Sequence, residues 1–151
     1  MFIEHMLDYT DARELLDFII EQAAGRQIAI AVVDLTGRLL AVASINGVGQ
    51  HYTDFAIAKA MTALHEELNT VDFRFIYEEG KYVERVDNLT WAEWELTHAA
   101  QLRPGFCGWA GGTVVNNPNN PDHIVGAIGV SGLSELEDHE LSFKRPEKWL
   151  Y

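Results

Sequence analysis

The feature that most constrains the fold is an apolar run late in the chain, from His123 to Val130, which continues into Ser131 and Gly132. Its length and its β-branched residues predict a buried strand. Glycine recurs within it, and a glycine inside a strand leaves room for another backbone, a side chain or a ligand to approach closely. The run is no phosphate-binding loop, because no Gly-Lys-Ser/Thr string follows it. We therefore expect a strand that packs tightly against a neighbouring element or lies beside a ligand.

The rest of the chain predicts helices and strands that do not alternate regularly. Apolar residues at helical spacing predict an amphipathic helix over about 8–24 and a second helix that begins at Tyr52-Thr53. Capping boxes at Thr90–Glu93 and Ser134–Glu137 predict two further helices, the first of them ending at about Gln101.

Strand signals lie between these helices. Two β-rich runs joined by a turn at 34–37 predict a hairpin over 28–43, and two more strands, 106–110 and 113–115, are expected around Gly111-Gly112. Residues 69–77 predict a short helical piece, 78–89 show no clear pattern, and the tail from Lys148 is expected to be peripheral. This order of elements favours a mainly antiparallel sheet covered by helices.

Composition bounds the function. A chain of 151 residues has the length of one domain, so we expect a single domain over 1–151. Eleven basic against 23 acidic residues give a net charge of −12, which disfavours nucleic acid and anionic membranes as partners. No apolar stretch is long enough to span a membrane. The single Cys107 and an acidic start of the chain predict a cytoplasmic protein.

Several strings in this order resemble the GlcG/HbpS-like family, which includes the C-terminal domain of PduO-type proteins. They are Ile30-Ala31-Val32-Val33-Asp34, then Ile57-Ala58-Lys59-Ala60, then Gly111-Gly112, and finally Val125-Gly126-Ala127-Ile128-Gly129-Val130-Ser131-Gly132 with Asp138. The resemblance implies an α/β (α+β) fold, a profilin-like α-β-α sandwich with a mainly antiparallel central sheet. It also implies a homo-oligomer, and haem as the candidate cofactor, since some members bind it.

The resemblance places the loop after the second strand, the start of the second helix and the double glycine near one another, which predicts a pocket for a small molecule. Its candidate binding residues are Asn46, His51, Tyr52, Lys59, Cys107, Gly111, Gly112, Thr113 and Ser131. His51 has the chemistry of an axial haem ligand or a general base. The six histidines show no zinc-site spacing, so no metal site is predicted.

Each candidate also has a purely structural interpretation. The glycines after Val125 serve tight packing, Cys107 acts as a small buried apolar residue, and His51 is merely exposed. The chain also departs from the family, because the usual Arg and Asp of an R-x-D-G-A string are replaced by Ser44–Val48.

Three hypotheses follow. The first is a haem- or small-molecule-binding protein accessory to a catabolic pathway. The second is a small cofactor-independent enzyme, an isomerase or hydrolase acting on a small organic acid or catabolic intermediate. In that enzyme His51 or Lys59 would transfer protons, and the N–H groups of Gly112-Thr113 would bind an oxyanion. The third is a structural subunit of a neighbouring enzyme.

Overall fold

The computed structural model describes residues 6–84 and 107–150. Its elements in chain order are α1 (Tyr9–Ala23), β1 (Ile28–Asp34), β2 (Leu39–Ile45), α2 (Gln50–Glu66), the short 3-10 helix η1 (Thr70–Phe73), β3 (Phe75–Glu78), β4 (Lys81–Glu84), β5 (Gly112–Asn117), β6 (Asn120–Ser131), α5 (Glu135–Ser142) and the 3-10 turn η3 (Glu147–Trp149). The helix predicted from Thr90 to about Gln101 lies outside the described residues.

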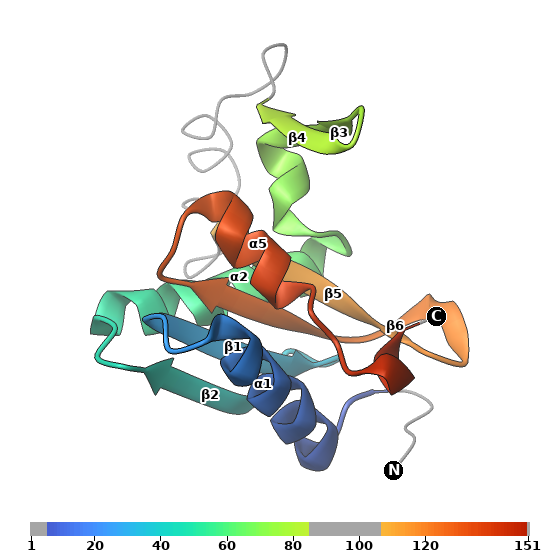
Figure 1. The fold of residues 1–151 in the computed structure, drawn as a ribbon. Helices are drawn as coiled ribbons and strands as arrows, with labels where there is room; N and C mark the ends of the chain where they lie inside the picture. The colour runs from blue at the N-terminus through green and yellow to red at the C-terminus, as the bar shows by residue number, and fades with distance from the viewer. Residues whose placement is uncertain (1–5, 85–106, 151) are drawn as a thin grey trace.

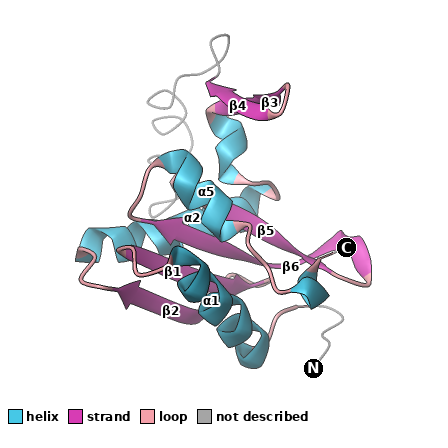
Figure 2. Cartoon of the chain, viewed as in Figure 1, coloured by secondary structure: helices cyan, strands magenta, loops and turns pink. Residues whose placement is uncertain are grey.

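The central sheet has four strands in the order β2-β1-β6-β5, and every neighbouring pair is antiparallel. Figure 1 shows α1 and α5 on one face of this sheet and α2 on the other, and Figure 2 shows the same layers by secondary structure. The strands β3 and β4 form a separate two-stranded hairpin. The predicted α+β sandwich with a mainly antiparallel central sheet is confirmed.

Alternation along β1 explains the two layers. Ile28, Ile30 and Val32 point into the main core beneath α1. The residues that alternate with them face α2: Ala29, Ala31 and Val33. Successive strand residues point to opposite faces, so one strand serves both layers. The small residues on the α2 side let that helix lie unusually close to the sheet.

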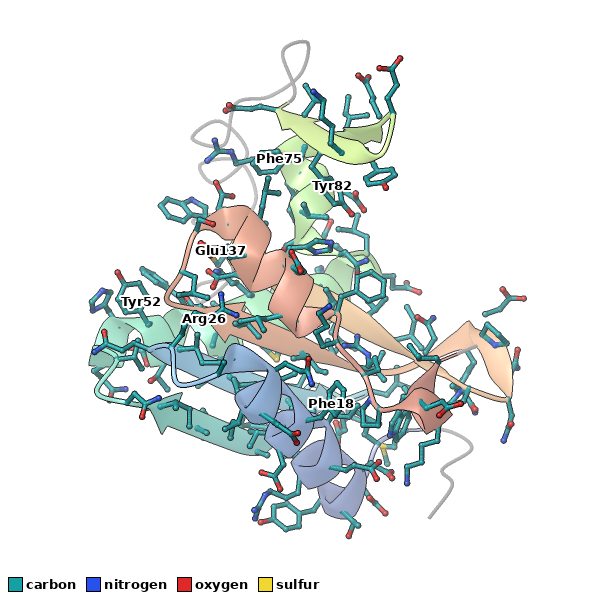
Figure 3. The ribbon with its side chains drawn as sticks, in the orientation of Figure 1. Phe18, Arg26, Tyr52, Phe75, Tyr82 and Glu137 are labelled. Atoms are coloured by element: carbon teal, nitrogen blue, oxygen red, sulfur yellow. The ribbon has the colours of Figure 1, made fainter. Side chains whose placement is uncertain are left out.

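Local signals set the helix ends. At the start of α1 the Asp8 carboxylate accepts a hydrogen bond from the Asp11 N–H, and the Asp11 carboxylate accepts one from the Asp8 N–H. These two bonds form a capping box. Ser134 and Glu137 form the same arrangement at the start of α5, as the sequence predicts. Arg26, just after α1, lies 3.6 Å from Glu137 and joins the two helices on this face (Figure 3).

Four expectations are corrected. Residues 69–77 do not form one helical piece, because η1 ends at Phe73 and Phe75–Glu78 form the strand β3. Residues 107–110 form a loop rather than the predicted strand 106–110, and β6 begins at Asn120, three residues before the expected start. The tail is not peripheral, because Trp149 is buried and its indole N–H donates to Glu14 at 2.8 Å. The Trp149 ring thus buries its apolar area in the core cluster that contains α1, and its N–H still has a hydrogen-bond partner.

Candidate functional site: an exposed aromatic cluster beside a buried ion pair

An exposed cluster of rings stands at the start of α2. The ring centroids of His51 and Tyr52 are 4.0 Å apart, and that of Phe55 lies 5.9 Å from His51 and 6.4 Å from Tyr52. His51 is exposed, Phe55 is 43% exposed, and Tyr52 is half-buried against the sheet. Figure 3 shows Tyr52 at the end of the sheet where α2 begins. We call His51, Tyr52 and Phe55 the aromatic cluster.

The backbone beside the aromatic cluster is suited to an anion. Helix α2 begins after Gly49, which offers no side chain to cap it, and its first turn holds no acidic residue. The first N–H groups of a long helix point outward and carry partial positive charge, which favours a carboxylate there. Gly49 also lets the His51 ring fold back over the loop, because a Cβ at that position would lie 3.0 Å from the ring.

A buried ion pair lies further along α2. The ammonium of Lys59 contacts the Asp138 carboxylate at 3.1 Å and donates to the carbonyl of Val130 at 3.0 Å, and both charged residues are 2% exposed. The other oxygen of Asp138 accepts the N–H of Leu133. Burial raises the pKa of Asp138, while the charge of Lys59 and these hydrogen bonds act against that rise.

The glycines of the sheet make room for this pair. A side chain at Gly129 would collide with the backbone of Ala56, one at Gly112 with the backbone of Lys59, and one at Gly111 would lie 3.0 Å from the Lys59 ammonium. Because these three glycines have no side chains, α2 can lie directly against the sheet and the Lys59 side chain can reach the end of β6. The packing interpretation of the glycine-rich strand therefore holds at Gly129.

The predicted binding residues do not form one open pocket in the described part of the chain. Asn46 sits in a turn with φ 57° and donates to the carbonyl of Gly25 at 2.9 Å. Cys107 is buried beside α2, where its N–H donates to Thr62. The hydroxyl of Thr113 donates to the carbonyl of Ser142 at the end of α5, and Ser131 is buried.

The remaining candidates fall into two groups. His51 and Tyr52 belong to the aromatic cluster on the surface, whereas Lys59, Gly111 and Gly112 meet at the buried ion pair. The N–H of Gly112 donates to the Thr70 hydroxyl at 2.9 Å. Phe55 and Asp138 were not among the predicted site residues. Asp138 stood in the strings that carry the resemblance, and Phe55 lies one helical turn from His51, so both left a signal in the sequence.

A third residue that was not among the predicted site residues is His139, on α5. It is 5% exposed, its Nε2 shares a hydrogen bond of 3.1 Å with the Tyr82 hydroxyl of β4, and its Nδ1 has no partner among the described residues. Figure 3 shows Tyr82 on the hairpin that faces α5. Burial lowers the pKa of this imidazole from 6.5 to about 4.

This lowered pKa predicts a loss of stability in acid. The stabilising contribution of neutral His139 is complete above pH 6.5 and is lost as the pH falls towards 4, because the unfolded chain then binds a proton that the folded chain refuses. The loss amounts to at most about 3 kcal/mol. Denaturant unfolding of the wild type and of His139→Gln at several pH values measures it, and the difference between them isolates His139 from the carboxylates. His65→Gln, an exposed histidine, is the control, and equal acid sensitivity of wild type and His139→Gln contradicts the prediction.

These observations define a class: a three-layer α-β-α domain with an antiparallel sheet, a glycine-rich central strand and a buried Lys–Asp pair at its end. A family model described as "Haem degrading protein HbpS-like" matches residues 7–144. The chain therefore belongs to the HbpS-like family, as the resemblance indicated. No curated protein matches it.

Solved structures agree on the fold. A double mutant of HbpS from Streptomyces reticuli is 24% identical, with 94% of this chain and 86% of that chain covered and a TM-score of 0.70. The protein ORFY of Klebsiella pneumoniae is 16% identical, with 94% and 89% covered and a TM-score of 0.71. A PduOC:heme complex is 18% identical, with 91% and 90% covered and a TM-score of 0.66. At these identities the likeness concerns the fold. No helix in the described ranges is both long and apolar enough to cross a bilayer.

Proposed function

We propose that this protein binds haem, or a similar flat, partly apolar and anionic cofactor, on the aromatic cluster at the start of α2. The observation that carries the proposal is the exposed imidazole of His51 in contact with the rings of Tyr52 and Phe55, at a helix start without a side-chain cap. Family membership and the haem complex of a structural neighbour support it.

The residues present fit such a ligand. His51 would supply a nitrogen ligand to the iron, since neither ring nitrogen has a hydrogen-bond partner among the described residues. Tyr52 and Phe55 offer apolar ring surface to a planar macrocycle. The N–H groups at the start of α2 would receive its carboxylates, in place of the basic side chain that the loop lacks. When bound, haem would supply the redox and ligand-binding chemistry of its iron.

We further propose that the protein is a cytoplasmic homo-oligomer that serves a catabolic pathway. The family resemblance supports the assembly, and a sequence with a single cysteine, Cys107, supports the compartment. The enzyme hypothesis has less support. Lys59 is engaged by Asp138 and Val130 inside the core, and the Gly112 N–H that would bind an oxyanion already donates to Thr70.

A haemin titration followed by absorbance tests this site. The wild type is expected to shift the Soret band with one saturable site. His51→Ala removes the axial nitrogen and is expected to weaken binding at least about tenfold, equivalent to about 1.4 kcal/mol, and to abolish the shift. His65→Ala, an exposed histidine at the far end of the same helix, is the matched control. Wild-type spectra from His51→Ala, or no binding by the wild type, would overturn the assignment.

A further inference from the structure

The two edges of the central sheet are treated differently. At β5, Val114 turns its backbone outward: its N–H donates to the Asn69 side chain at 3.0 Å and its carbonyl accepts from Arg145 at 3.1 Å. Gly112, two residues earlier, donates to Thr70. Side chains from the start of η1 and from the segment after α5 thus bond the outward groups of Gly112 and Val114. An edge whose N–H and C=O groups are already bonded does not recruit another strand.

The β2 edge has no such protection in residues 6–84 and 107–150. No side chain or backbone group described there bonds to the outward edge of Leu39–Ile45, although the strand is seven residues long. It contains no charged residue and no proline, and Leu39 and Val42 are each 43% exposed. Natural edge strands usually carry lysine, proline or a covering element, because an unprotected edge pairs with another chain.

We propose that β2 is the surface on which two copies of this chain pair, strand against strand about a two-fold axis, so that their sheets become continuous. This inference rests on the proposed homo-oligomer and names the surface that builds it. In the antiparallel pair, Val42 lies across from the Val42 of the second copy. Two exposed apolar side chains then cover each other, and each outward N–H and C=O of β2 gains a partner.

The helices accommodate this pairing. Helix α1 packs over both β1 and β2. Neighbouring strands are about 4.8 Å apart. Pairing of two β2 strands therefore places the two α1 helices about 10 Å apart, at the outer limit of ordinary helix packing. The α1 helices would thus contact each other above the new strand pair without displacing either one.

Charge on the open side of α1 favours a second copy as the occupant. The groove between α1 and β2 is lined on the helix by Tyr9, Arg13 and Asp17, and Arg13 lies 3.6 Å from Asp17 one turn away. A two-fold axis reverses the second helix, which brings Arg13 of one copy towards Asp17 of the other. The chain has a net charge of −12, so most of its surface would repel a second copy. On this side of α1 one positive and one negative charge cancel, and β2 carries no charge, so two copies can meet here without repulsion.

A charge placed on the strand tests the pairing. Val42→Lys puts two ammonium groups opposite each other and is expected to convert the oligomer to its half-size or to monomer in light scattering coupled to gel filtration. Val83→Lys is the control, because Val83 is a similarly exposed strand valine (38%) on the separate β3-β4 hairpin. A monomeric wild type, or an unchanged mass for Val42→Lys, overturns the proposal.

Charge reversal on α1 tests the partner's identity. Arg13→Glu makes the helix surface doubly acidic and Asp17→Arg makes it doubly basic, so each variant alone is expected to pair more weakly than the wild type. Mixed together, the two variants are expected to pair with each other, which native mass spectrometry detects as a hetero-oligomer. Two variants that stay separate when mixed, or that each assemble like the wild type, contradict the two-fold arrangement.

The failure of this inference is distinguishable from failure of the proposed ligand site. Val42→Lys leaves His51, Tyr52 and Phe55 intact, so haemin is titrated into it as into the wild type. A variant that loses assembly and keeps the Soret shift supports both proposals, and one that keeps its mass overturns only the pairing surface.

Discussion

Lys59→Met is expected to lower the free energy of unfolding by about 3–5 kcal/mol, because it leaves the Asp138 carboxylate in the core without its cation. Methionine retains most of the apolar stem, so the loss comes from the charge and from the bond to the Val130 carbonyl. Urea unfolding at neutral pH measures the difference. Because Asp138 lies in the first turn of α5, the amide protons of that helix are expected to exchange faster in the variant.

The double variant Lys59→Met/Asp138→Leu distinguishes two causes of the loss: the cost of an unpaired carboxylate in the core, and the loss of the ion-pair contact itself. Removing both charges is expected to recover a large part of the loss, since no uncompensated carboxylate remains. Lys144→Met supplies the matched control, because it breaks an exposed ion pair with Glu140 and is expected to change stability by at most about 1 kcal/mol. A loss at Lys59 as small as that at Lys144 would mean that the buried pair contributes little.

Gly129→Ala is the second large effect and is expected to cost at least about 3 kcal/mol. The added methyl group would overlap the Ala56 carbonyl and approach the Ala60 nitrogen, and both belong to the backbone of α2. The helix can relieve the overlap only by moving away from the sheet. That movement would separate Ala60 and Ala63 from Val33 and Ala127 and open a gap in the core.

The control for Gly129→Ala is Gly49→Ala, the same substitution at the N-cap of α2. There the new methyl group would press against the His51 ring, which can turn away, and would lie at ordinary contact distance from Tyr52, and the backbone φ is −63°. We expect a loss of about 1 kcal/mol or less. Thermal and urea unfolding compare the two. Similar losses for both would refute the close approach of α2 to β6.

Elements with strong local signals were predictable. The capped amphipathic helix α1, the hairpin of β1 and β2, and the start of α5 at Ser134 follow from periodicity, turn chemistry and a capping box. The β3-β4 hairpin was missed, although Glu79 and Gly80 both adopt positive φ in its two-residue turn. A four-residue strand gives too little alternation to be recognised, and glutamate is an unusual residue for such a turn.

The site was harder to predict than the fold. Lys59 and Asp138 are 79 residues apart, and only the packing of α2 and α5 at the end of β6 brings them together. The predicted pocket residues lie on both faces of the sheet, because successive residues of a strand point to opposite faces. Thr113 points towards α5, whereas Gly112 before it faces α2. His51 and Tyr52 are neighbours on one helix turn, and for that reason their proximity was visible in the sequence.

The capped β5 edge has a consequence for aggregation. A protein with two unprotected edges can add copies at both ends of its sheet, and such addition continues without limit into a fibre. Here Asn69, Thr70 and Arg145 occupy outward groups of Gly112 and Val114 in the first half of β5, so a copy that has paired through β2 presents no equally open second strand to the next. Sheet growth therefore terminates after one round, and loss of Arg145 or Asn69 would expose a new end from which it could continue.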